Sequence, residues 1–468
     1  MKSRHQVSRR QFIGNTALAA SAFTIVPRHV LGGPKFVAPS EKVNIAIVGV
    51  GGQGRSNTRA LFQLPDAQII AVADPIENHN LEGFYYKGQA GRKPVKAEIE
   101  KHYSQKTPNF RVAEYEDFRV MLEKEKDIDA VLCATPDHLH AYVSITAMRA
   151  GKHVYCEKPL THNIWEARQV ARVARETGVA TQMGNQGHSN DGIRETCEWI
   201  WDGAIGEVRE VHAWVATNRW NPTLSGRPKE TPPIPPGVNW DLWMGPREPR
   251  PFHPAYTPVA WRDFWAFGSG ALGDFGCHDL DSSVWSLDLH EPISVEGKPA
   301  GRMDADITPH GEICYFNFGA RAEKPPVRIT WYDGGLMPPR PEELKPTEPL
   351  PNRGVLFVGN KGLMLCGGAG GKPRLLPESR KETYKIPAPT LPRSKGHHHE
   401  WVTAIKGGPP AASNFEYGAR LTEIVLLGVL SLRTARKIYW DAAKMAARHV
   451  PEADGIIKEK YREGWEIG

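Results

Sequence analysis

The 468-residue sequence has only six cysteines, and none stands in a spacing typical of a metal site or a redox pair. It also lacks an apolar run of the roughly 18 residues that a membrane span requires. The chain is long enough to bury a core without disulfide bonds. We therefore expect no metal site, no membrane span, and buried free thiols at Cys133, Cys156, Cys197, Cys277, Cys314 and Cys366.

Most of the chain has no excess of positive or negative charge. The net charge is +6, but residues 1–40 contain six basic residues and no acidic one. The remainder has equal numbers of basic and acidic residues. Because nucleic-acid binding needs a basic surface facing the phosphates, we exclude nucleic acid as a partner.

The first 40 residues carry a pair of arginines. Arg9 and Arg10 precede Phe12, Ile13 and a short run of small apolar residues. This segment resembles a twin-arginine export signal, which a receptor recognises and which is no membrane anchor. The resemblance implies a signal and linker over residues 1–40 and a periplasmic or exported protein that folds before export.

A glycine motif follows the first apolar segment. Residues 41–50 predict a buried parallel strand, which continues into the G-x-G-x-x-G sequence of residues 49–54 and a helix from Arg55 to about Leu64. The first glycine permits a tight turn, the second lets the backbone approach a pyrophosphate, and the third lets the helix pack on the strand. The motif predicts a dinucleotide site at the helix N-terminus.

An acidic residue stands at the end of the next predicted strand. Ala67–Ala73 ends at Asp74, 20 residues beyond Gly54. A carboxylate at this place accepts hydrogen bonds from the adenosine ribose and repels a 2′-phosphate. The sequence therefore favours NAD over NADP as the cofactor.

Strands and helices continue to alternate up to residue 184. The predicted strands are Asp129–Ala134, His153–Cys156 and Ala180–Met183, and the predicted helices are Ala141–Ala150 and Ile164–Thr177. This alternation predicts an α/β Rossmann domain with a doubly wound parallel sheet over residues 41–184. Polar segments at 135–140, 157–159 and 184–186 follow the strand ends, where such sheets bind ligands.

Four motifs in order carry a family resemblance: GVGGQG at 49–54, ATPDHLH at 134–140, YCEKPL at 155–160 and GSGALGDFGCH at 268–278. The chain resembles the glucose–fructose oxidoreductase/inositol dehydrogenase (Gfo/Idh/MocA) family of NAD(P)-dependent sugar and polyol oxidoreductases. The resemblance implies an enzyme whose catalytic residues are Lys158, Asp274 and His278. The candidate cofactor-binding residues are Gly49, Gly51, Gly52, Gln53, Gly54, Asp74, Thr135, Pro136, His138, His140, Glu157, Lys158, Gln186, Trp261 and Arg262.

The candidate catalytic residues suit the oxidation of a secondary alcohol. A desolvated Lys158 can hold or polarise the substrate oxygen. Asp274 and His278 are four residues apart in a predicted helix over Gly273–Leu287, so they share one face, which Asp281 and Trp285 continue. A neutral His278 is then a plausible base, and Asp274 would grip a neighbouring hydroxyl.

The rest of the chain, residues 185–468, predicts a substrate-binding and oligomerisation domain. A helix is expected over Asp191–Asp202, and strands over Val208–Thr217, Ser294–Gly297, Gly311–Phe318, Val327–Tyr332 and Gly354–Gly359. The resemblance implies an α+β domain with an open, mainly antiparallel sheet, and a homo-oligomer.

Two further segments leave alternatives open. Long proline-rich loops are expected at 221–258 and 337–352, and the aromatic residues in and around the first suit either a sugar ring or packing beneath the loop. The three adjacent histidines at 397–399 cannot all face one ion. We expect them at the entry to a helix that begins near Glu400, with a place for one of them on the wall of the cleft left open.

Three functions remain in competition. The leading one is hydride transfer between a tightly bound nicotinamide cofactor and a secondary hydroxyl of a sugar, glycoside or polyol. The second is NAD-dependent cleavage of a glycoside by transient oxidation and elimination; the branch of the family that does this tends to lack the lysine of the EKP motif, which this chain keeps. The third is non-enzymatic sugar binding, for which the three candidate catalytic residues are not needed. Export of a folded protein further implies a cofactor inserted before export.

Overall fold

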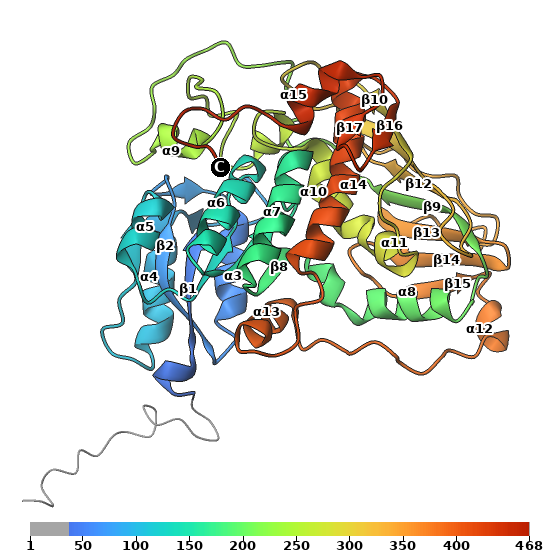
Figure 1. Ribbon diagram of the computed structural model, residues 1–468, viewed down its shortest axis with the longest axis horizontal. Helices are drawn as coiled ribbons and strands as arrows, with labels where there is room; N and C mark the ends of the chain where they lie inside the picture. Colours follow the sequence, from blue (N-terminus) through green and yellow to red (C-terminus); the bar gives the residue numbers. More distant parts are fainter. Residues whose placement is uncertain (1–36, 468) are drawn as a thin grey trace, which may run out of the picture.

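A computed structural model describes residues 37–467. Two β-sheets lie side by side, and helices pack between and around them (Figure 1). The segment with Arg9 and Arg10 lies outside the described residues. Among the residues that are described, no helix has the length and apolar character needed to cross a membrane.

The first sheet has six parallel strands in the order β5-β2-β1-β6-β7-β8. After β1, the strands β2 and β5 are added on one side of it, and β6, β7 and β8 are added on the other side. The strand order therefore reverses beside β1. This is the doubly wound Rossmann arrangement, which confirms the predicted fold of this part. The strands are β1 (Val43–Val48), β2 (Ala67–Ala73), β5 (Ala113–Tyr115), β6 (Ala130–Cys133), β7 (His153–Glu157) and β8 (Thr181–Gly184). The helices are α3 (Gly52–Leu61), α4 (Arg92–Ser104), α5 (Phe118–Lys124), α6 (Asp137–Arg149) and α7 (Ile164–Thr177).

Local sequence explains several of these boundaries. Asn163 and Glu166 form a capping box that starts α7, and Gly178 ends it in the left-handed conformation. Residues of β6 are all buried, as expected for a central parallel strand covered on both faces. A two-stranded hairpin, β3 (His79–Asn80) and β4 (Gln89–Ala90), stands between β2 and α4.

The second sheet is open and mainly antiparallel, which confirms the expectation from the resemblance. Its order is β15-β14-β13-β9-β12-β11-β10-β16-β17, with β9 and β12 pairing in parallel. The strands are β9 (Val208–Val215), β10 (Ser294–Ala300), β11 (Gly311–Phe318), β12 (Val327–Tyr332), β13 (Arg353–Gly359), β14 (Gly362–Gly367), β15 (Pro373–Leu376), β16 (Ile438–Asp441) and β17 (Ala446–Ala447). The helices after β8 are α8 (Asp191–Trp201), α9 (Trp240–Met244), α10 (Gly270–Asp279), α11 (Asp281–Ser286), α12 (Arg380–Thr383), α13 (His397–Ile405), α14 (Phe415–Thr434) and α15 (Asp454–Ile457). Of these, α13 packs against the first sheet through Trp401 and Val402.

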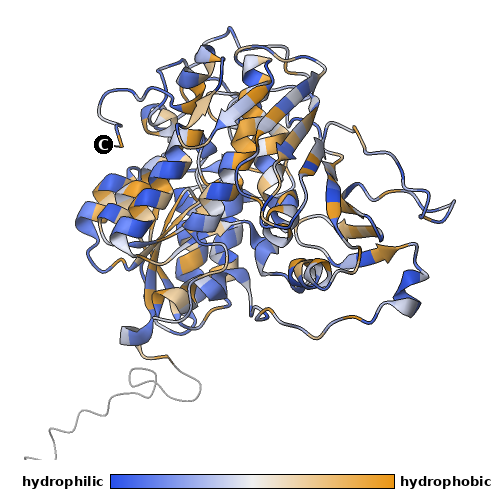
Figure 2. Cartoon of the chain, turned by 45° about the vertical axis from the view of Figure 1, so that its right-hand side comes forward, coloured by the Kyte–Doolittle hydropathy of each residue, from blue (hydrophilic) through white to orange (hydrophobic). Residues whose placement is uncertain are grey.

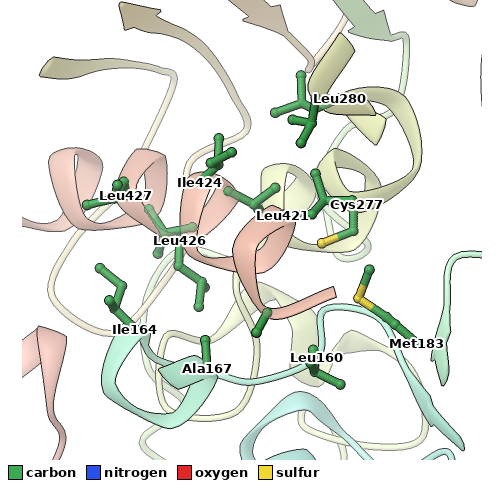
Figure 3. Close-up of a cluster of buried hydrophobic side chains, with 14 of the residues drawn as sticks. Leu160, Ile164, Ala167, Met183, Cys277, Leu280, Leu421, Ile424, Leu426 and Leu427 are labelled. Atoms are coloured by element: carbon green, nitrogen blue, oxygen red, sulfur yellow. The ribbon is translucent and has the colours of Figure 1, made fainter. Parts of the chain in front are cut away.

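One long helix joins the two parts. The helix α14 packs against α7 of the first part and against α10 and β10 of the second. Figure 3 shows its leucines Leu421 and Leu426 between Ile164 of α7 and Cys277 of α10. Helices at the surface are different: they carry orange and blue residues on one ribbon, as amphipathic helices do (Figure 2). The buried apolar contacts of α14 therefore hold the two sheets in a fixed relation.

The structure corrects two predicted helices. The first begins at Asp137, four residues earlier than predicted, so His138 and His140 lie in the first turn of α6 and not in a strand-end loop. The second is broken at Leu280 into α10 and α11. Because of this break, Asp281 does not continue the face of Asp274. Its carboxylate instead contacts His188 at 2.9 Å, and Trp285 stacks on the same histidine.

The six cysteines agree with the prediction. All are buried and free.

Candidate active site

The glycine motif forms a tight turn between β1 and α3. Gly49 has a φ of +83°, and a Cβ there would lie 2.7 Å from the carbonyl oxygen of Ala134. A Cβ on Gly54 would lie 1.9 Å from the carbonyl oxygen of Gly49, so only glycine lets α3 sit this close to the strand. Gly51, by contrast, has open space where a Cβ would point. The loop and the free N–H groups at the start of α3 thus fit a dinucleotide pyrophosphate.

Asp74 stands beside this loop at the end of β2. Its carboxylate accepts hydrogen bonds from the backbone N–H groups of Val50 at 2.9 Å and Ile76 at 2.8 Å. The residue is 5% exposed and borders a cavity at the carboxyl ends of the first sheet. The turn after β1 and the end of β2 therefore hold the carboxylate in one orientation, as a ribose ligand requires.

A cavity of about 470 Å³ lies at the carboxyl ends of the first sheet and extends to the second part of the chain. All three candidate catalytic residues border it. Of the candidate cofactor residues, those that border it are Gly49, Gly51, Gly52, Gln53, Asp74, Thr135, Pro136, His140, Glu157, Lys158, Gln186, Trp261 and Arg262. Gly54 lies behind them in the turn, and His138 does not reach the cavity.

His138 is therefore a packing residue in this structure. Its ring is 1% exposed, and its nitrogens contact the backbone carbonyls of Trp243 at 2.9 Å and Phe267 at 3.3 Å. Burial, with the nearby Arg247, holds its pKa well below the usual value. The sequence motif does not show which of His138 and His140 reaches the cavity. That depends on the direction in which each side chain points from the first turn of α6.

Lys158 and Asp274 are joined directly. Lys158 Nζ donates a hydrogen bond to Asp274 Oδ1 at 2.6 Å and another to the Asp274 carbonyl. Arg262 Nε lies 3.2 Å from the same Oδ1, and Trp220 Nε1 donates to Oδ2 at 3.1 Å. Burial by itself would favour the neutral acid, but the two cations outweigh it and hold the pKa of Asp274 well below its usual range. The Asp274 carboxylate thus stays ionised and fixes the end of Lys158.

His278 lies one helical turn beyond Asp274 on α10 and borders the same cavity. Its Nδ1 is buried with no hydrogen-bond partner in the described chain. Burial, followed by the positive charges of Lys158 and Arg353, lowers its pKa well below 6.5. The imidazole is therefore neutral near pH 7, and its Nδ1 has no hydrogen-bond partner in the described chain.

Two buried acids also border the cavity. Glu157 accepts hydrogen bonds from Asn57 at 2.8 Å and Gln186 at 3.0 Å, and burial raises its pKa. Asp137 accepts one from Ser269 at 3.2 Å, and burial, partly offset by Arg262, raises its pKa to about 7. Asp137 lies within the ATPDHLH motif but was not among the predicted site residues.

The aromatic residues around the first proline-rich loop divide between the two roles left open. Trp240, Phe252 and Tyr256 pack together in a buried cluster. Trp220 instead borders the cavity and stacks on Tyr85 of the β3–β4 hairpin, with ring centroids 5.8 Å apart.

The cavity wall also contains residues that the sequence did not predict as site residues, among them Tyr85, Tyr86, Asp137, Phe275 and Arg353.

The histidines at 397–399 form the first turn of α13, which begins three residues earlier than the predicted start near Glu400. They contact separate partners, and none of them borders the cavity. His397 Nε2 contacts the Met183 carbonyl at 2.8 Å, and His398 Nε2 contacts Asn57 at 3.1 Å. One other group has the residue types of a metal site: the ligand atoms of Cys133, His140 and Cys156 lie within 4.8 Å of one another. Both nitrogens of His140 already contact backbone carbonyls, at 2.7 and 2.9 Å.

Comparison with known sequences shows the family. The description "Oxidoreductase family, NAD-binding Rossmann fold" matches residues 43–185, and "Oxidoreductase family, C-terminal alpha/beta domain" matches residues 202–316. Both descriptions belong to the Gfo/Idh/MocA family, and together they cover more than half of the chain. The chain belongs to this family. Its first domain is accordingly an NAD-binding Rossmann domain.

Individual relatives in the family are distant. The chain is 31% identical to a 2,7-anhydro-N-acetylneuraminate hydratase of Mediterraneibacter gnavus over 39% of this chain and 42% of that protein. It is 24% identical to a levoglucosan dehydrogenase of Pseudarthrobacter phenanthrenivorans over 52% of this chain and 50% of that protein. The chain thus spans about half the length, or less, of these two relatives.

A solved structure supports the fold. The WlbA dehydrogenase of Bordetella pertussis, in complex with NADH and UDP-GlcNAcA, matches with a TM-score of 0.57 and 16% identity, over 86% of this chain and 99% of that one.

Proposed function

We propose that this protein transfers a hydride between NAD and a secondary hydroxyl of a sugar, glycoside or polyol. One observation carries the proposal. Lys158, Asp274 and a neutral His278 with an unpartnered nitrogen meet in the same cavity as the dinucleotide turn. Pure binding of a sugar does not require this combination.

The cofactor fits the residues of the first domain. The glycine turn would hold its pyrophosphate and Asp74 its adenosine ribose, and the carboxylate would disfavour a 2′-phosphate, so we propose NAD in preference to NADP. Bound there, the nicotinamide supplies or accepts the hydride.

The remaining steps belong to side chains of the chain itself. Lys158, fixed by Asp274, donates a hydrogen bond to the reacting oxygen and stabilises negative charge on it. His278 takes the hydroxyl proton on a free ring nitrogen, because burial keeps the imidazole neutral. Trp220 and Tyr85 stack on each other at the wall of the cavity, where they can contact the apolar face of a sugar ring.

A second candidate is NAD-dependent cleavage or hydration of a sugar by transient oxidation and elimination. The observation in its favour is Asp137, a second group in the cavity whose pKa of about 7 lets it give or take a proton. A named hydratase among the relatives is consistent with this chemistry.

The test is a panel of sugars, inositols and glycosides added to the NAD-loaded protein, with reduced nicotinamide followed by absorbance. We expect at least one compound to reduce the cofactor, and Lys158→Ala to slow this step by about 100-fold or more while leaving bound NAD in place. Release of phenol from an aryl glycoside without an added electron acceptor would favour the second candidate. Equal rates for Lys158→Ala and the wild type would contradict the assigned role of the lysine.

Two further proposals concern the protein in its cell. The twin-arginine segment supports export to the periplasm, and the family resemblance supports a homo-oligomer. A cavity bordered both by Tyr85 of the β3–β4 hairpin and by Trp220 supports a cofactor that contacts both parts of the chain and stays bound between turnovers.

A further inference from the structure

Arg353 borders the cavity from the second sheet. It is the first residue of β13 and lies beyond both segments that match the family descriptions. Its side chain is 31% exposed and shares the cavity wall with Phe275 and His278 of α10. In the proposed reaction its positive charge helps to keep His278 neutral, and its N–H groups have no assigned function.

The guanidinium of Arg353 is held in place from behind. Its Nε donates to the carboxylate of Asp279 at 2.9 Å, and its Nη2 lies 2.9 Å from Asp279 Oδ2. Asp279 is fully buried and also accepts a hydrogen bond from the backbone N–H of Ala369 at 2.9 Å. The Phe275 ring centroid lies 5.2 Å from the guanidinium carbon. The edge of the guanidinium that carries Nε and Nη2 therefore faces Asp279, and this contact fixes the orientation of the group.

A glycine makes room for this side chain. A Cβ on Gly368 would lie 2.4 Å from Cγ of Arg353 and 2.8 Å from its Nε. The middle of the arginine thus fills the space that any larger residue at 368 would need. This packing and the ion pair with Asp279 preorganise the arginine before a ligand arrives.

The remaining nitrogen is free for a ligand. No described residue accepts a hydrogen bond from Arg353 Nη1. Because the buried Asp279 balances the positive charge, this N–H group suits an uncharged oxygen better than a second carboxylate. On the same wall, the buried Nδ1 of His278 also lacks a partner.

We propose that Arg353 is a specificity-determining residue, which donates a hydrogen bond to a hydroxyl of a neutral sugar or polyol and so places the reacting carbon beside Lys158 and His278. This inference rests on the proposed function and narrows its substrate class to uncharged polyhydroxy compounds. Substrate acids, such as uronates, would bind less well.

The experiment compares Arg353→Gln and Gly368→Ala with Arg209→Gln, which changes an exposed arginine on β9 of the same sheet. The probes are paired: methyl glucoside with methyl glucuronide, added to NAD-loaded protein. Rates of cofactor reduction give kcat and KM, and the shift of the melting temperature by each sugar reports binding without turnover.

We expect Arg353→Gln to raise KM for the neutral sugar by about 10- to 100-fold, the usual effect of losing a charge-assisted hydrogen bond, with bound NAD unchanged. Gly368→Ala keeps the guanidinium but displaces it, so KM should rise in the same direction by less. The wild type should prefer the methyl glucoside, and Arg209→Gln should match it.

Three results separate the possibilities. Equal KM and equal thermal shifts for Arg353→Gln and Arg209→Gln would overturn the role of Arg353. A preference of the wild type for the glucuronide that disappears in Arg353→Gln would overturn the neutral substrate class. A thermal shift that depends on Arg353, without turnover of any compound, would support the binding role and contradict the proposed oxidation.

Discussion

Two buried carboxyl groups in one cavity ionise differently because their neighbours differ. Asp274 lies against Lys158 and Arg262, and these cations keep it charged. Asp137 has a hydrogen bond from the neutral Ser269 hydroxyl, and its charged neighbours act from farther away, so burial dominates. The same residue type is thus an anchor at one position and a proton-exchanging group at the other.

Asp137 should make stability depend on pH. Its pKa is about 7 in the folded protein and near 3.8 when unfolded, so between these values the folded state holds a proton that the unfolded chain has released. The free energy of unfolding therefore falls as pH rises from about 4 to about 7. Asp137→Asn cannot ionise, so its free energy of unfolding lacks this fall. Between pH 5 and pH 7.5 its free energy of unfolding should therefore rise relative to that of the wild type by about 2–3 kcal/mol, at 1.36 kcal/mol per pKa unit.

Urea unfolding at several pH values measures this difference. The exposed Asp127→Asn serves as the control, and its curve should run parallel to that of the wild type. A parallel curve for Asp137→Asn would show that Asp137 is ionised throughout.

At the scale of elements, the turn between β1 and α3 depends on different glycines for different reasons. Gly54 lets the helix approach the strand, whereas Gly51 leaves open space toward the cavity. The contact at Gly54 is with backbone, which cannot move aside as a flexible side chain can. Cofactor binding and helix packing are therefore separable within one motif.

Substitution of each glycine by alanine should separate them. Gly54→Ala should lower the free energy of unfolding by about 1–3 kcal/mol, since the added methyl overpacks the turn, and should also reduce the NAD content. Gly51→Ala should leave stability nearly unchanged but reduce the NAD content, because the methyl occupies space that the pyrophosphate needs. Thermal unfolding and the NAD released on denaturation give the two readouts, with Gly455→Ala on exposed α15 as the control. Full NAD content in Gly51→Ala would place the pyrophosphate elsewhere.

At the scale of the whole molecule, the two parts meet around the cavity. The β3–β4 hairpin of the first part reaches Trp220 of the second through Tyr85, and the ring of Tyr86 lies where a Cβ on Gly52 would be. The helix α14 holds the parts together from the other side of α7 and α10. A dinucleotide bound in the turn would be enclosed by both parts, which favours slow release.

We predict that the protein keeps its NAD through gel filtration and carries it during export. Wild-type protein from the periplasm should contain bound NAD, and a variant with Arg9→Lys and Arg10→Lys should accumulate in the cytoplasm, folded and with the same NAD content. Free NAD is scarce outside the cytoplasm, so a retained cofactor lets an exported enzyme work there. Folded protein without NAD that needs added NAD for activity would contradict retention, and undiminished export of the double-lysine variant would contradict the signal.

Local patterns in the sequence determined the first domain and most of the candidate site. Strand periodicity, the glycine motif and Asp74 depend on residues close together in the chain, so their arrangement follows from short-range geometry. The helix α14 was not predicted from the sequence. Its residues are buried on nearly all sides, so its sequence lacks the amphipathic period that marks a surface helix.

Contacts between distant residues were decided only by the tertiary structure. Arg353 comes to the cavity because β13 starts beside α10, 74 residues after Asp279 in the chain. The burial of His138, the ionisation of Asp137 and the break at Leu280 likewise follow from packing between elements. These features depend on which surfaces meet when the two sheets assemble around α14. The residues next to them in the sequence do not determine those contacts, because the partners lie far away in the chain.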